Sequence, residues 1–206
     1  MKPKLIIFDL DGVLIDSTRI VADYFVELQP KLSREILNEW LCENFHSALK
    51  KFSDVHGEIE STDEQENAYI ARKAASPLFL GVRELLEELK ACNYILAINT
   101  SAEPENCLPG LKQTGIKDFF DVIAHKGVSR SKVEKFKILG EKYSLKPEEI
   151  IFVTDTLGDL READLAGIPT IAVTYGAHNR SFFERERHDN LIAIVDSVGE
   201  LGKSLL

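Results

Sequence analysis

Short runs of β-branched and aliphatic residues, separated by helix-like stretches, limit the possible folds of this chain more than any other feature. Buried strands are expected at residues 4–8, 94–98, 121–124, 150–153 and 170–173. Residues 191–195 are a candidate sixth strand. Between the later runs, apolar residues recur at three- and four-residue spacing, most clearly in GVRELLEELKA at 81–91. Strands that alternate with helices predict an α/β fold with a doubly wound, Rossmann-like parallel sheet.

The alternation breaks between residues 16 and 80, where helical periodicity is found without a convincing strand. Helices are expected at 20–28, 36–41 and 62–75. An insertion this long is more than a loop. We interpret residues 16–80 as a small helical domain over the carboxyl edge of the sheet, and residues 1–15 and 81–206 as the core domain. The alternative is a set of extra helices packed on that core.

Composition narrows the class of protein. With 206 residues, 44% of them hydrophobic, the chain can bury one full core and a small accessory domain. Its net charge of −9 argues against binding a nucleic acid polymer and leaves small phosphorylated metabolites as partners. The three cysteines, Cys42, Cys92 and Cys107, show no close metal-ligand spacing. Without a signal peptide or an apolar segment of membrane-spanning length, we expect a cytoplasmic protein; the oligomeric state is not encoded in any pattern.

Two carboxylates, Asp9 and Asp11, follow the first expected strand with one residue between them. Buried like charges this close are costly unless a cation or a shared proton compensates them. The pair therefore indicates a metal site, a proton-transfer pair, or both. Asp16, further along, is interpreted either as a helix cap or as a substrate contact.

Polar residues also follow two other expected strands. Thr100 and Ser101 come after the second strand, and Asp155 comes at the end of the fourth, with Asp159 one helical turn further on. Lys132 lies close to the start of a helix. Because ligands bind beyond the carboxyl ends of the strands in open α/β sheets, we expect these side chains to form one site.

Four motifs resemble those of the haloacid dehalogenase superfamily. FDLDGVLIDS resembles its first motif, AINTS its second, and TDTLGD its fourth, while Lys132 resembles the third-motif lysine. The motifs occur in order, and the resemblance covers residues 1–15 and 81–206. The insertion at 16–80 is similar in position to the helical cap of the first cap class.

The resemblance implies a hydrolase, a Mg²⁺-dependent phosphatase acting on a small phosphomonoester. Asp9 would be the nucleophile and form an aspartyl-phosphate. Asp11 would donate its backbone carbonyl to the metal, while its side chain protonates the leaving oxygen and later activates water. Asp9 and Asp155 would supply hard oxygen ligands to Mg²⁺.

The remaining motif residues have supporting roles in this interpretation. Thr100 would bind a phosphoryl oxygen, and Ser101 would also bind phosphate or only start a helix. Lys132 would offset charge on Asp9 and the phosphate, and Asp159 would hold Lys132 or a metal-bound water. Many relatives follow the third-motif lysine with proline, whereas Lys132 precedes valine; the alternatives for this cation are Arg130 and Lys126.

Other functions remain open from the sequence. A sugar-phosphate mutase would share the whole constellation, and a signalling module phosphorylated on aspartate or a catalytically silent binding protein are candidates from other classes. Retention of Asp11 and Asp155 argues against dehalogenase chemistry, which needs neither a metal nor this acid. The segment ENFHSALKKF is the candidate substrate-facing part of the insertion, with polar residues Asn44, His46, Lys50 and Lys51.

Overall fold

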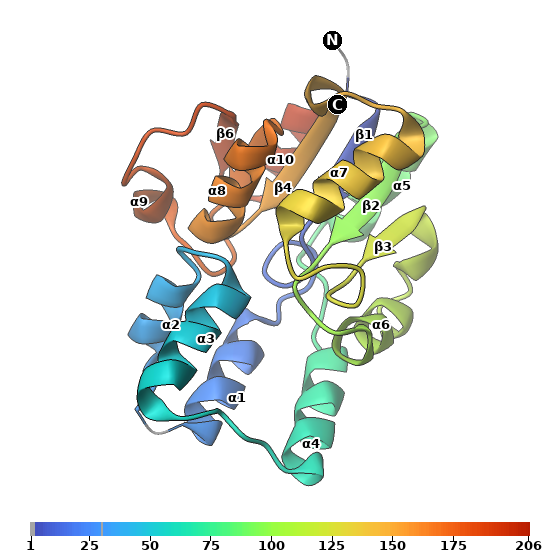
Figure 1. The fold of residues 1–206 in the computed structure, drawn as a ribbon. Helices are drawn as coiled ribbons and strands as arrows, with labels where there is room; N and C mark the ends of the chain where they lie inside the picture. Colours follow the sequence, from blue (N-terminus) through green and yellow to red (C-terminus); the bar gives the residue numbers. More distant parts are fainter. Residues whose placement is uncertain (1–2, 30) are drawn as a thin grey trace.

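The computed structural model describes residues 3–29 and 31–206, and its centre is a six-stranded parallel sheet (Figure 1). The strands are β1 (Leu5–Phe8), β2 (Ile95–Asn99), β3 (Val122–Ala124), β4 (Ile150–Thr154), β5 (Thr170–Val173) and β6 (Leu191–Val195). They are arranged in the order β3-β2-β1-β4-β5-β6, and every adjacent pair is parallel. This confirms the predicted α/β doubly wound sheet, including the candidate sixth strand.

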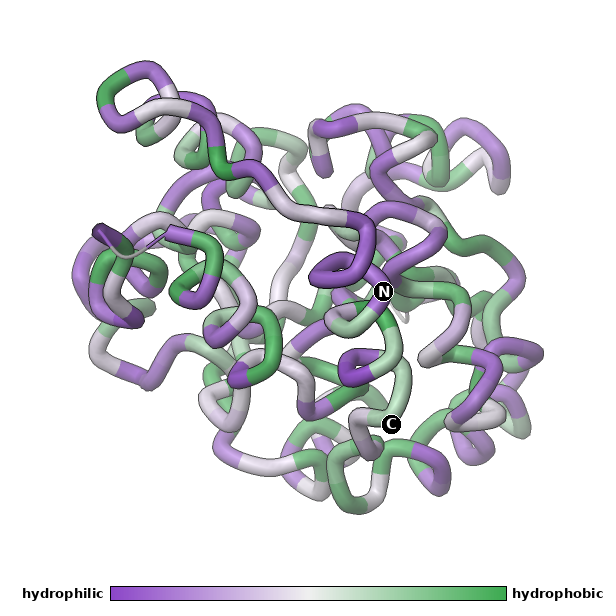
Figure 2. Tube along the Cα trace, turned by 90° about the horizontal axis from the view of Figure 1, so that it is seen from below, coloured by the Kyte–Doolittle hydropathy of each residue, from purple (hydrophilic) through white to green (hydrophobic). Residues whose placement is uncertain are grey.

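Helices connect the strands on both faces of the sheet. Those after the insertion are α5 (Val82–Ala91), α6 (Pro104–Gln113), α7 (Lys132–Tyr143), α8 (Leu157–Ala166), α9 (Arg180–Phe183) and α10 (Val198–Leu205), with 3-10 helices at Lys117–Phe119 and Pro147–Glu149. Figure 2 shows hydrophilic and hydrophobic segments alternating along the trace, as expected for helices with one buried side.

The sheet is buried on both faces, which explains its continuous apolar strands. All four residues of β1 are fully buried. Because successive side chains point to opposite faces, Leu5 and Ile7 pack in a cluster with residues of α7 and α8. Ile6 and Phe8 pack in a second cluster with residues of α5, α6 and α10. The two faces thus anchor β1 firmly at the centre of the sheet.

Four helices form the insertion between β1 and β2: α1 (Thr18–Leu28), α2 (Arg34–Trp40), α3 (Phe45–His56) and α4 (Asp63–Ala74). They lie beyond the carboxyl ends of the strands (Figure 1). A small apolar cluster of their own contains Leu32, Leu37 and Phe52. Three of the four helices match predicted segments. The segment that forms α3 was expected only to be polar and to face the substrate. In the structure it is a helix, and Asn44 caps it by accepting a hydrogen bond from the amide of Ser47.

The insertion is attached to the core by contacts around the start of α8. The amide of Gly158 donates to the carbonyl oxygen of Leu41 at 2.8 Å. The side chain of Asn44 donates to Glu162 at 2.9 Å, and the ring of His178 contacts the carbonyl oxygen of Asn38 at 2.9 Å. These contacts hold α2 and α3 above the sheet edge where the predicted site residues lie.

Candidate active site

The carboxyl end of β1 is the point where the connections of the sheet change direction. The neighbours of β1 are β2 on one side and β4 on the other, and the chain reaches them in opposite directions. Such a switch point leaves a crevice at the strand ends. Asp9 follows β1 directly, and its amide donates to the carbonyl oxygen of Val153 on β4 at 2.9 Å. The sheet itself therefore places Asp9 in the crevice.

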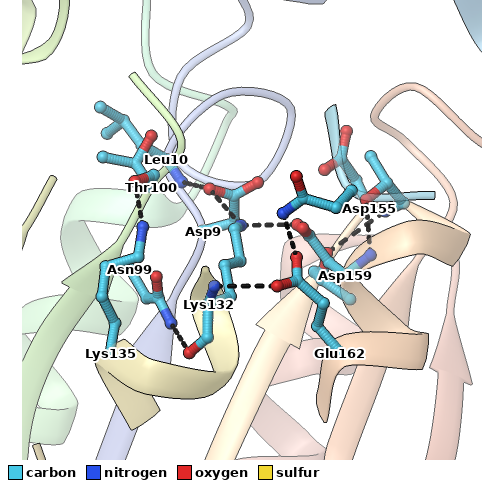
Figure 3. A network of polar contacts seen from close by, with 12 residues as sticks. Asp9, Leu10, Asn99, Thr100, Lys132, Lys135, Asp155, Asp159 and Glu162 are labelled. Atoms are coloured by element: carbon cyan, nitrogen blue, oxygen red, sulfur yellow. Dashed lines mark hydrogen bonds and ion pairs between the residues drawn. The ribbon is translucent and has the colours of Figure 1, made fainter. Parts of the chain in front are cut away.

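Asp9 and Lys132 form an ion pair in this crevice (Figure 3). The ammonium group of Lys132 lies 3.1 Å from Oδ1 of Asp9 and 2.6 Å from Oδ2 of Asp159. Lys132 is buried and is the first residue of α7, whose N-cap is Ser131. Its own amide donates to Oε1 of Glu162 at 2.9 Å. The buried start of α7 thus carries the cation to the nucleophile candidate.

The two alternatives for this cation form no ion pair with Asp9 among the described residues. Lys126 forms an ion pair with Glu103, and the side chain of Arg130 belongs to an exposed residue. Of the three candidates, Lys132 is the one that the structure brings to Asp9. The sequence could not select among them, because the loop between β3 and α7 determines which lysine is buried.

Asp155, at the end of β4, sits in a cradle of backbone atoms. Its Oδ2 accepts a hydrogen bond from the amide of Ala177 at 2.8 Å. A β-carbon at Gly12 would lie 1.9 Å from this oxygen, and one at Gly176 would lie 2.4 Å from it. Gly12 also has a φ of +77°, which glycine adopts readily. Both glycines therefore allow the backbone to close around the Asp155 carboxylate.

The second oxygen of Asp155 is buried and has no hydrogen-bond partner. Burial, together with the charge of Asp9, raises the pKa of Asp155 well above its usual range. Burial also raises the pKa of Asp9 to about 7, although the charge of Lys132 opposes this shift. Two buried acids with an unpartnered oxygen fit a hard divalent cation, because such a cation would accept that oxygen as a ligand and favour both ionised forms.

The predicted phosphate-binding residues follow β2. Thr100 is buried, and its Oγ1 accepts a hydrogen bond from the amide of Ala102 at 3.2 Å. Its carbonyl oxygen accepts a hydrogen bond from the ammonium group of Lys135 at 2.6 Å (Figure 3). Ser101 is partly buried beside it, and both residues line the same cavity as Asp9. Thr100 and Ser101 thus lie in the same cavity as the carboxylates, as expected from their position after a parallel strand.

Asp159 is held between the fourth strand and Lys132. Its Oδ2 accepts hydrogen bonds from Lys132 at 2.6 Å and from Oγ1 of Thr154 at 2.9 Å. Thr154 therefore contributes a contact that a glycine at this position would lack. Thr156 caps α8 by accepting a hydrogen bond from the amide of Asp159. The carboxylate of Asp159 holds the lysine rather than pointing into solvent.

Asp11 is held on the insertion side of the cavity. Its carboxylate accepts a short hydrogen bond from the hydroxyl of Ser17 and forms an ion pair with Lys73 at 2.7 Å. Lys73, on α4, is buried; burial alone would lower its pKa, but the charge of Asp11, the neighbouring Tyr69 and the hydrogen bond to Asp11 together outweigh this effect and raise the pKa. Asp16 is exposed, and Ser17 makes no side-chain cap bond to α1. The hydroxyl of Ser17 therefore binds Asp11 and does not cap α1.

Sequence reasoning missed four side chains that support this site: Ser17, Lys73, Lys135 and Glu162. Lys135 lies three residues after Lys132, on the same side of α7, and that spacing could have indicated it. Nothing in the local pattern distinguishes Lys73 from the exposed lysines of the chain. Its role is visible only because α4 returns to the first loop.

The four polar residues suggested in the segment ENFHSALKKF have different surroundings in the structure. His46 lines the cavity above the carboxylates. Asn44 instead contacts the core, Lys51 forms an ion pair with Glu43, and Lys50 is exposed. Of these four residues, only His46 belongs to the cavity walls formed by the described part of the chain.

Comparisons with known proteins agree with this geometry. Residues 6–173 match the family model of the haloacid dehalogenase-like hydrolases. The chain is similar to the tyrosine-protein kinase PtkA of Mycobacterium tuberculosis, with 29% identity over 98% of this chain and 72% of that protein. It is also similar to the phosphoglycolate phosphatase of Haemophilus influenzae, with 27% identity over 84% of this chain and 86% of that protein.

The structural comparison points to the same group. A crystal structure described as a predicted phosphoglycolate phosphatase from Haemophilus somnus superimposes with a TM-score of 0.74 and 25% identity, over 100% of this chain and 99% of that one. The chain belongs to the haloacid dehalogenase-like hydrolase family, in its phosphatase-like branch. Within residues 3–29 and 31–206, no helix has the length and apolar character required to cross a membrane.

Proposed function

We propose that this protein is a Mg²⁺-dependent phosphatase that hydrolyses a small phosphomonoester through an aspartyl-phosphate on Asp9. The observation that carries the proposal is the unpartnered buried oxygen of Asp155 beside Asp9, at the switch point of the sheet. Family membership and the similarity to a phosphoglycolate phosphatase support it. Residues 16–80 would act as the cap domain and residues 1–15 and 81–206 as the catalytic core.

In the first half of the proposed reaction, the ionised carboxylate of Asp9 attacks phosphorus, and the bond to the leaving oxygen breaks. The carboxyl group of Asp11 gives its proton to that oxygen. Lys132 offsets the charge that Asp9 and the phosphate bring together, at a distance of 3.1 Å from Asp9. A Mg²⁺ ion held by Asp9, Asp155 and the backbone of Asp11 would neutralise phosphate charge.

In the second half, the carboxylate of Asp11 accepts a proton from a water molecule that attacks the phosphorus of the aspartyl-phosphate. The phosphate leaves, and Asp9 regains its carboxylate. Thr100 and Ser101 would hold the phosphoryl oxygens during both steps, and Asp159 would keep Lys132 in place. The ion pair with Lys73 and the hydrogen bond from Ser17 would hold the side chain of Asp11 in place during both halves.

The proposal is tested by phosphate release from a panel of phosphomonoesters, measured with MgCl₂ and with EDTA. We expect release that depends on the metal, no release by Asp9→Asn, and an accumulated phosphoenzyme in Asp11→Asn that intact-mass spectrometry detects. The matched control is Asp16→Asn, because Asp16 is an exposed acid of the same loop. Normal turnover by Asp9→Asn would disprove the covalent mechanism.

The relative named a tyrosine-protein kinase suggests one further assay. Incubation with ATP and a tyrosine-containing peptide, followed by mass spectrometry of the peptide, separates transfer to a protein acceptor from transfer to water. We expect no phosphopeptide, because water is the acceptor in the proposed reaction. Stoichiometric phosphopeptide without phosphate release would replace the hydrolase proposal by a transferase.

A further inference from the structure

A cavity of about 500 Å³ lies between the insertion and the core. Its floor contains the carboxylates and Thr100, and its walls come mainly from the four helices of the insertion, α1 to α4. A cavity of this size holds a ligand much larger than a phosphate group. Since the phosphoryl group must reach Asp9 on the floor, the leaving group of the substrate would occupy the space against the helices.

The walls of this space are largely apolar. The apolar side chains that line it are Val21, Ala22, Tyr24, Phe25, Leu37, Leu41, Phe45, Leu49 and Tyr69. The rings of Phe25 and Phe45 meet edge to face at 5.4 Å, and those of Tyr24 and Tyr69 stack at 4.0 Å. A leaving group covered with hydroxyls would lose its hydration here without enough partners, whereas an apolar one gains from burial.

The charged groups of the cavity disfavour a second anion on the substrate. Seven carboxylates and five cationic side chains line it among the described residues. All five of these cations have carboxylate partners. The pairs are Arg19 and Arg34 with Asp23, Lys73 with Asp11, Lys126 with Glu103, and Lys132 with Asp9 and Asp159. A carboxylate or a second phosphate on the substrate would have to compete with these carboxylates for a cation and would be repelled by them.

Besides the buried Oδ1 of Asn106, which has no hydrogen-bond partner, His46 adds an uncharged polar atom to the cavity walls. Its Nε2 is buried and has no hydrogen-bond partner, and its ring meets that of Phe45 edge to face at 5.8 Å. Burial lowers the pKa of His46 to about 4, so the ring is neutral at pH 7. A buried polar atom of this kind can satisfy one hydroxyl or N–H group of a ligand.

We propose that the leaving group of the substrate is a neutral, ring-sized and largely apolar alcohol, with at most two hydrogen-bonding groups that would face His46 and Asn106. This substrate class rests on the proposed phosphatase function, and it excludes phosphorylated carboxylic acids and bisphosphates as preferred substrates. Phe25 and Phe45 would pack on the ring of the leaving group.

The test compares kcat/KM for three alkyl phosphates of different charge: benzyl phosphate, 2-phosphoglycolate and phosphocholine. Acetyl phosphate, whose leaving group barely enters the cavity, reports on the core chemistry alone. We expect benzyl phosphate to be preferred over the other two alkyl esters by on the order of tenfold or more. Hydrolysis of acetyl phosphate with a preference for 2-phosphoglycolate or phosphocholine overturns the substrate class only. If neither acetyl phosphate, an acyl phosphate, nor any of the three esters is hydrolysed, the proposed function and this inference are overturned together.

Two variants of α3 separate recognition from folding. Phe45→Ala should lower the ratio of kcat/KM for benzyl phosphate to that for acetyl phosphate by on the order of tenfold, and Phe45→Leu should lower it less. The control is Val55→Ala, because Val55 lies on the same helix, is 74% exposed and lies outside the cavity walls. If Phe45→Ala lowers both rates equally, Phe45 has only a structural role and the proposed packing on the leaving group is wrong.

Discussion

The buried acids of the site predict how the stability of the metal-free protein depends on pH. Asp9 has a pKa of 3.8 when unperturbed, and burial raises it to about 7 in the folded chain. A group whose pKa is raised by folding contributes full stability below its unfolded pKa, and this contribution is lost as pH rises to the folded pKa. Stability due to Asp9 should therefore fall between about pH 4 and pH 7.

The size of the effect follows from the shift of about three pKa units. At about 1.4 kcal/mol for each unit, ionisation of Asp9 without a metal ion costs about 4 kcal/mol. For a chain of this length, that corresponds to on the order of 10 °C in Tm. Replacing the carboxylate by an amide should remove this loss, because the oxygen of the new side chain could still accept the hydrogen bond that the amide of Leu10 donates at 2.8 Å.

The assay is thermal unfolding of wild type and Asp9→Asn in EDTA, at pH 5 and pH 8. The quantity to compare is the difference in Tm between the two proteins at each pH. Burial lowers the pKa of His46 and His178, so these histidines change stability with pH in the opposite sense to Asp9. Both proteins contain them, so their effect cancels in the difference. We expect Asp9→Asn to be the more stable protein at pH 8, and the difference to shrink at pH 5. MgCl₂ should restore wild type at pH 8. An unchanged difference between the two pH values would refute the reasoning.

Three further substitutions test other parts of the structure. Lys132→Met should destabilise the fold by about 3–5 kcal/mol in urea unfolding, because it leaves buried carboxylates without their cation. Asp11→Asn should lower kcat by at least about 10² in steady-state assays, and a normal kcat would end its role as acid and base. Gly158→Ala would place a β-carbon 2.3 Å from the carbonyl oxygen of Glu43, so a loss of about 1–3 kcal/mol is expected. Its control is Gly199→Ala, where a new β-carbon meets only a side chain at 3.9 Å and should be neutral or stabilising.

Much of the fold could be predicted because its patterns are local. Continuous apolar runs such as LIIF in β1 indicate strands buried on both faces, and the structure buries all four residues. The helix α3 was not predicted, because its stretch FHSALKKFSDVH mixes polar residues with a few apolar ones. Its position depends on the insertion's own apolar cluster and on contacts such as that of Asn44 with Glu162.

For the candidate site too, some residues could be placed from local sequence patterns and others could not. Asp9, Asp155 and Thr100 could be placed from sequence, because each follows a strand whose carboxyl end must lie at one edge of a parallel sheet. Lys73 could not, because its carboxylate partner is 62 residues away in the chain. Roles for these residues remain predictions until turnover and metal binding are measured.

By itself, the sequence determined which segments are strands, that they pair in parallel, and which carboxylates lie at their ends, because these properties follow from the local periodicity of burial. Only the tertiary structure decided that Lys132 reaches Asp9, that Asp11 is held by Lys73, and that an oxygen of Asp155 is left without a partner. The physical reason is that ion pairs and buried oxygens depend on side chains brought together by closure of distant segments, and no local pattern specifies that closure.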